Sequence, residues 1–134
     1  MRVLEFIAVC VVALLLGIIF AKYFYHQAAW LVTFEHFLGG DAMLHFFVGF
    51  LLTFSLAVFL RLQRLLVRWQ LVYFVTVALL YGADEFLQIW VPHRIVSWHD
   101  LIYSMLGWLT ALILWFVVTG LRRHVIKSKL SNAT

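Results

Sequence analysis

The sequence predicts an all-α integral membrane protein, a four-helix bundle in which residues 1–134 form a single domain. The chain is 66% hydrophobic and 12% charged, whereas a soluble domain is about 45–50% apolar and about 25% charged. It contains four apolar runs close to the roughly 20 residues that a helix needs to cross a bilayer. No segment alternates apolar and polar residues as barrel strands do, so helices are the expected spanning structure.

The apolar runs set the expected helices, which cover residues 4–24, 43–60, 71–90 and 101–121. The first run is longer than the roughly 7–15-residue core of a signal peptide and is not followed by an A-x-A site, so we expect a retained helix. Residues 25–40 are rich in aromatic side chains and end in Gly39 and Gly40. We expect them to form a loop along the outer membrane interface without a catalytic role.

The cations predict the orientation. Of the ten lysine and arginine residues, eight lie before the first run, between the second and third, or after the fourth. Cytoplasmic loops are enriched in such residues, so both termini and the 61–68 loop are predicted to be cytoplasmic (N-in/C-in). The net charge of +4 therefore reflects topology and weak attraction to anionic lipid, and it predicts no nucleic-acid partner. The remaining two cations are Lys22 and Arg94.

Residues 81–107 form a polar outer hairpin between the third and fourth expected helices. Glu85 and Gln88 share a face at the outer end of the third helix, and Pro92, the one proline of the chain, ends that helix. Arg94 follows, and its planar guanidinium suits bidentate binding of a carboxylate or phosphate. The structural alternative is an ion pair with Glu85 or Asp100.

The second expected helix opens with Asp41 and His45, which lie four residues apart and therefore on one face. Gly49 and Thr53 continue that face with small side chains, which is typical of a surface packed on another helix. In the structural interpretation, Asp41 caps the helix N-terminus and His45 makes an interhelical hydrogen bond.

Ser97 and Asp100 fit the capping box [ST]-x-x-[DE] ahead of the fourth apolar run. Helix initiation alone explains both residues. Asp100 also shares a stripe with Ser104, Gly107 and Ala111, which we expect to face the bundle.

Because these ionisable groups all fall on the outer side, we expect a shared functional pocket there. A metal held by Asp41, His45, Glu85 and Asp100 is an open alternative, but spacing alone is weak evidence for a ligand set, and no metal ligand is assigned. The sequence does not identify a cofactor, and the lone Cys10 forms no internal disulfide. The candidate catalytic residues are Glu85, Asp100 and His45, and the candidate ligand-binding residues are Arg94, Gln88, Asp41 and Ser104.

These motifs resemble the VanZ-like family of small bacterial membrane proteins. The first part of the resemblance is DAMLHFFVGF, with Asp41 and His45. The second part is EFLQIWVPHRIVSWHDLIYSMLG, which reads E-x-x-Q, P-x-R, S-x-x-D and a glycine. The chain departs from the family pattern at Ala42, His93 and Ser104, where lysine, glycine and asparagine are frequent. The resemblance implies no established reaction, and the glycopeptide resistance behind the family name is not transferred to this chain.

The resemblance implies a multi-pass protein of the bacterial cytoplasmic (inner) membrane. We expect its outer pocket to recognise an anionic lipid head group or a lipid-linked wall precursor through Arg94. The alternatives are a membrane enzyme doing acid/base chemistry on such a lipid, and a structural subunit without a ligand. The partner expected is membrane lipid, and the sequence does not indicate an oligomeric state.

Overall fold

The computed structural model describes residues 2–24, 29–87, 90 and 97–131. Within these ranges the chain forms five α-helices and a short 3-10 turn, with no strand, which confirms the all-α class. The elements are α1 (Arg2–Phe24), α2 (Ala29–Leu38), α3 (Asp41–Phe59), η1 (Leu62–Arg64), α4 (Val67–Leu87) and α5 (Trp98–Ser131).

Four of the described helices are long and apolar enough to cross a membrane, which agrees with the predicted multi-pass class. The candidate spans are Val3–Ala21, Asp41–Phe59, Val67–Leu87 and Trp98–Arg122. Large apolar side chains such as Phe6 (69% exposed) and Leu79 (69% exposed) point away from the protein interior. A soluble monomer rarely shows so much apolar surface, whereas a bilayer covers it.

Two features of the described chain differ from the sequence prediction. Residues of the expected interfacial loop form α2, a helix of 10 residues that is too short to span a bilayer. Helix α5 continues to Ser131, about ten residues beyond the predicted end, and has 34 residues in all. Its polar end still contains good helix formers, so only the hydrophobicity stops near the predicted boundary. At about 1.5 Å per residue α5 is roughly 50 Å long, which exceeds a hydrocarbon layer of about 30 Å.

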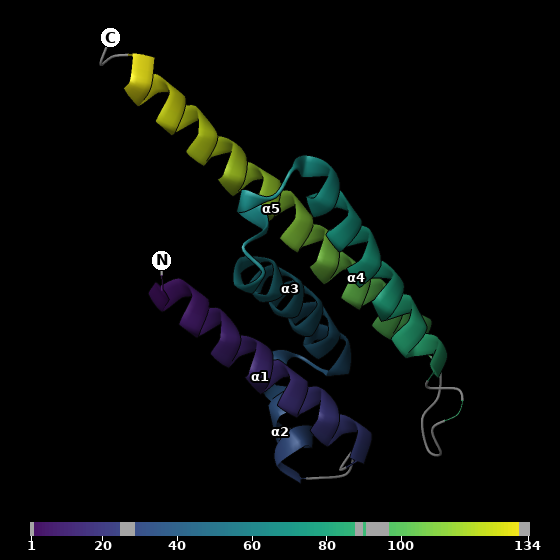
Figure 1. Ribbon diagram of the computed structural model, residues 1–134. Helices are drawn as coiled ribbons and strands as arrows, with labels where there is room; N and C mark the ends of the chain where they lie inside the picture. Colours follow the sequence, from purple (N-terminus) through teal and green to yellow (C-terminus); the bar gives the residue numbers. More distant parts are fainter. Residues whose placement is uncertain (1, 25–28, 88–89, 91–96, 132–134) are drawn as a thin grey trace.

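Helix α3 is the centre of the arrangement. It packs against α5 most extensively and also contacts α1 and α2, while α4 lies against α5. Figure 1 shows α3 between α1 and α5, with α4 alongside α5. At the end where α1 begins and α3 finishes, the Arg61 guanidinium donates to the Glu5 carboxylate at 2.6 Å. This contact joins Arg61 of the predicted cytoplasmic 61–68 loop to Glu5, near the start of the first predicted helix.

Helices α3 and α5 approach so closely because glycines lie at their contact. A Cβ atom added at Gly49 would lie 2.5 Å from the backbone carbonyl oxygen of Ser104. A Cβ atom added at Gly107 would clash with the backbone of Phe46 and Phe50. Small residues permit this backbone approach between membrane helices. Close contact is needed there because lipid is as apolar as the helix surfaces, so burying those surfaces against each other gains little.

Helix α4 is attached through long aromatic side chains instead. The Tyr73 hydroxyl donates to the Thr53 carbonyl oxygen of α3 at 2.7 Å. Trp108 of α5 donates its indole N–H to the Phe74 carbonyl oxygen at 2.9 Å. Trp115 donates to the Gln70 side-chain oxygen at 3.0 Å, inside a core that contains Ala57, Leu62 and Phe74. These bonds satisfy polar groups that lipid cannot satisfy.

Alanine at Gly107 should lower the stability of the protein, because the new Cβ would meet α3 backbone. Such overpacking typically costs about 1–3 kcal/mol. Alanine at Gly120, in the same helix, would have nothing within 4 Å. It replaces a poor helix former and should keep or raise stability, by up to about 1 kcal/mol. Thermal unfolding of both variants in detergent tests the opposite signs, and equal shifts would contradict the close packing of α3 on α5.

Candidate functional site

Three predicted site residues meet where α3 and α5 begin. The His45 Nε2 atom lies 3.6 Å from Asp41 Oδ1 on its own helix and 3.7 Å from Asp100 Oδ2 on α5. We call Asp41, His45 and Asp100 the outer cluster, after the side predicted from the cations. The side chains of His45 and Asp100 are 15% and 14% exposed, whereas that of Asp41 is 46% exposed. The cluster is therefore half buried and open on the Asp41 side.

The fourth member of the site is Ser104, whose hydroxyl lies 3.3 Å from Nδ1 of His45. Ser104 is buried between the helices, at 8% exposure. Because Ser104 contacts Nδ1, the imidazole ring is oriented with Nε2 toward the two carboxylates. The predicted ligand-binding residue Ser104 thus contacts the candidate catalytic residue His45. This contact between α3 and α5 is also the interhelical hydrogen bond expected for His45.

Local backbone features explain why the cluster forms. The turn before α3 uses positive φ angles at Gly39 (98°) and Gly40 (108°), which L side chains rarely adopt. The N-cap of α3 is Gly40 and makes no side-chain cap bond, so the interpretation of Asp41 as the cap is wrong. Asp41 is the first helical residue, where a carboxylate is favoured by the helix dipole. One turn further, His45 precedes Gly49, whose contact with Ser104 fixes α3 against α5.

The capping prediction at the start of α5 is confirmed, with one change. The Asp100 backbone N–H donates to the Ser97 hydroxyl at 3.3 Å, as expected for an N-cap serine. In a complete capping box the N3 acid would accept from the backbone N–H of the cap. Here the Ser97 N–H instead donates to Glu85 Oε1 of α4 at 2.6 Å, while the Asp100 carboxylate lies near His45.

Glu85 therefore links α4 to the start of α5. It is buried, at 6% exposure, so it does not face lipid. Its connection to the outer cluster runs through Ser97, which contacts both Glu85 and the Asp100 backbone. The predicted ligand-binding residues Gln88 and Arg94 lie outside the described residues, as does Pro92.

Sequence analysis missed several polar contacts below the cluster. Tyr81 donates to the Gly49 carbonyl oxygen at 3.1 Å and also contacts the Thr53 hydroxyl at 3.1 Å. The sequence placed Thr53 on the same helix face as His45, but it gave no reason to pair that face with Tyr81 of the next long helix. The signal available in the sequence was the position of Tyr81, one helical turn before Glu85.

The geometry allows two kinds of chemistry in the outer cluster. An imidazole beside carboxylates can take up and release protons, which is the basis of general acid–base catalysis. The same three groups each offer a ligand atom within 4.8 Å of one another, so they could also hold a cation. Ser104 would support either role by fixing the orientation of the ring.

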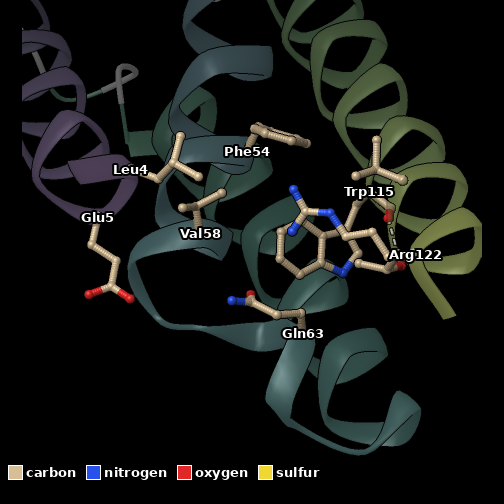
Figure 2. A pocket seen from close by; sticks show the side chains of 9 residues that line it. Leu4, Glu5, Phe54, Val58, Gln63, Trp115 and Arg122 are labelled. Atoms are coloured by element: carbon tan, nitrogen blue, oxygen red, sulfur yellow. Dashed lines mark hydrogen bonds between the residues drawn. The ribbon is translucent and has the colours of Figure 1, made fainter. Parts of the chain in front are cut away.

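A cavity of about 160 Å³ lies at the opposite end of the protein, between α1, α3 and α5. Its walls are mainly apolar, and Glu5, Gln63 and Arg122 contribute polar groups. Figure 2 shows Phe54, Val58 and Trp115 among the side chains that line it. None of its lining residues was predicted as a site residue, and it contains no member of the outer cluster.

Alanine at Ser97 should lower the stability by about 1 kcal/mol, because it removes the hydroxyl that caps α5. Asparagine at Ser97 is the matched control, since its side chain also accepts from backbone N–H groups at this position. Both variants keep the backbone N–H that donates to Glu85. Thermal unfolding in detergent should rank the native protein and the asparagine variant above the alanine variant. An asparagine variant as unstable as alanine would contradict the capping role.

No family model, no curated protein and no solved structure matches this chain. The VanZ-like resemblance therefore rests on the motifs of the sequence. Residues from both parts of that resemblance, Asp41 and His45 from the first and Asp100 from the second, lie together in the outer cluster.

Proposed function

We propose that this chain is a VanZ-like protein of the bacterial cytoplasmic membrane whose outer site recognises the head group of a membrane lipid. The ligand class is an anionic lipid or a lipid-linked wall precursor. The observation that carries the proposal is the outer cluster, in which His45 of α3 meets Asp100 of α5.

The depth of the cluster supports a head-group ligand. Asp41 is the first residue of its candidate span, and Asp100 lies near the start of its own. Ionisable side chains cost roughly 2.5–3.5 kcal/mol at the bilayer centre and less near its edge. Positions at the start of two candidate spans support a site near the level of the lipid head groups, and the exposed side of Asp41 would offer access from that level.

An anionic ligand requires a positive partner, and Arg94 is the residue that we propose for this role. Its planar fork can bind a phosphate or carboxylate through two parallel hydrogen bonds. The argument for Arg94 rests on the sequence, because the residue follows Pro92 in the outer hairpin.

The second candidate function is an enzyme that acts on the same lipid. The arrangement of His45 between two carboxylates favours it, since such a group can transfer protons to and from a substrate. In this alternative, Glu85 or Asp100 serves as base and His45 as acid or base. The two functions differ in whether a modified lipid is released.

The N-in/C-in orientation is tested with reporter fusions, one after Arg123 and one within residues 91–98. The first should report the cytoplasm and the second the outer side, because eight of the ten cations belong to the predicted inner segments. Reports from the same side would contradict the proposed topology. Reversed reports would put the outer cluster on the cytoplasmic side and would overturn the proposed ligand class.

The lipid proposal is tested by identifying the lipids that remain bound to the purified protein by mass spectrometry. Glutamine at His45 or asparagine at Asp100 should reduce the bound anionic lipid about tenfold, since the first removes the imidazole from the site and the second weakens the contact that holds the imidazole in place. Asparagine at Asp84 is the control, a carboxylate change on α4 outside the cluster. Equal retention by all variants would contradict the proposal, and a modified lipid released by the native protein would favour the enzyme.

A further inference from the structure

The spacing within the outer cluster does not suit direct hydrogen bonds. The distances of 3.6 and 3.7 Å from His45 Nε2 to the two carboxylate oxygens exceed the roughly 2.7–3.2 Å of an N–H···O bond. Nitrogen and oxygen ligands lie about 2.0–2.2 Å from a zinc ion, so two ligands at a tetrahedral angle are roughly 3.3–3.6 Å apart. The distance from His45 to Asp41 falls in this range and the distance to Asp100 is slightly longer, so both are close to the spacing of ligand atoms around one ion.

We propose that Asp41, His45 and Asp100 bind one divalent metal ion of the zinc or manganese class. The ligand atoms are Nε2 of His45 and one oxygen from each carboxylate. Imidazole favours zinc among the common divalent ions, and carboxylates suit manganese as well as zinc. The proposal deepens the proposed function of this site, and it relies on that function only for the identity of the outer ligand.

The surroundings of the cluster are those of a supported metal site. A ligating histidine usually bonds its second ring nitrogen to a neighbouring polar group, which fixes the tautomer and the ring orientation. Ser104 is in that position, 3.3 Å from Nδ1 and buried. When Nδ1–H donates to the Ser104 hydroxyl, Nε2 has its lone pair directed at the two carboxylates, an arrangement that a cation stabilises.

The helices also hold the ligands from two directions. The glycine contacts fix α3 on α5 beside Ser104, and Ser97 caps the turn that contains Asp100. Three protein ligands leave a further coordination position, as in catalytic zinc sites. Because Asp41 is the most exposed of the three, that position would face the outer side, where a phosphate or carboxylate oxygen of a head group can complete the coordination.

A bound ion would change what the site attracts. A divalent ion would add two positive charges beside the carboxylates of Asp41 and Asp100, and it would present a Lewis acid to an anionic ligand. The metal thus explains how a site built from acidic side chains can serve an anionic lipid.

The test uses the full chain in detergent without a histidine tag, in a Cys10→Ser background so that no thiol competes for zinc. After chelation and desalting, ZnCl₂ or MnCl₂ is titrated by calorimetry and the bound metal is counted by mass spectrometry. We expect one ion per chain. His45→Gln and Asp100→Asn should each weaken binding at least 100-fold. His99→Gln, which changes an exposed histidine beside Asp100, should leave it unchanged.

Zinc-edge X-ray absorption provides a readout that a purely structural role would not produce, with one imidazole and oxygen ligands expected in the native protein. If His45→Gln fails to fold, Asp41→Asn replaces it, because Asp41 is about half exposed. Binding that is absent, or equally strong in the His45 and His99 variants, would overturn the proposal.

The lipid measurement, repeated with chelated protein, separates this proposal from the function on which it builds. Lipid that is lost on chelation and restored by zinc or manganese supports both. Lipid retained by metal-free protein would leave the head-group function in place and overturn the metal as its anchor. Metal binding with no lipid in any sample would support the metal site and contradict the proposed function.

Discussion

The close contact of α3 with α5 is the interaction on which the rest of the structure depends. Gly49 and Gly107 let the two backbones approach until no Cβ atom would fit between them. In lipid, helices gain little from burying apolar surface against each other, so close van der Waals contact and interhelical hydrogen bonds have to hold them together. The same contact sets the register in which His45 lies opposite Ser104 and Asp100.

The polar groups of the described chain are used in two ways. In the interior of the spans, tyrosine and tryptophan side chains donate to backbone carbonyl oxygens, as Tyr73 does to Thr53 and Trp108 does to Phe74. These bonds attach α4, whose own glycine, Gly82, has no neighbour within 4 Å of an added Cβ atom. At the start of α3 and α5, the ionisable groups are instead gathered around one imidazole. The first set explains how the helices hold together, and the second set is the one on which the proposed site is based.

Much of the described fold could be predicted because it depends on local pattern. The four long helices follow from apolar runs, the Ser97 cap follows from a four-residue motif, and the stripes of small residues point to the packed faces of α3 and α5. The stripes indicated that Asp41, His45, Asp100 and Ser104 face inward, and spacing within each helix placed them near the same end.

Other features could not be read from local pattern, because they depend on which helices are neighbours. The bond of Glu85 to the Ser97 N–H joins α4 to α5, and nothing in either segment specifies the other. The hydrogen bonds from the tryptophans of α5 to α4 also could not be predicted, since a tryptophan in a membrane span can equally face lipid. The C-terminal end of α5 was predicted too early because the hydrophobic run marks the part of a helix that can lie in the membrane, and the helix continues beyond it.

The central claim is that α3 and α5 hold the side chains of His45 and Ser104 in contact. Cysteines in place of both residues, in a Cys10→Ser background, test it through oxidative cross-linking in native membranes. The control pair has cysteines at His45 and Leu106, and Leu106 is an exposed position on another face of α5. The account predicts a rapid intramolecular disulfide for the first pair and little for the control. A control pair that cross-links as readily, or a first pair that stays reduced, would contradict it.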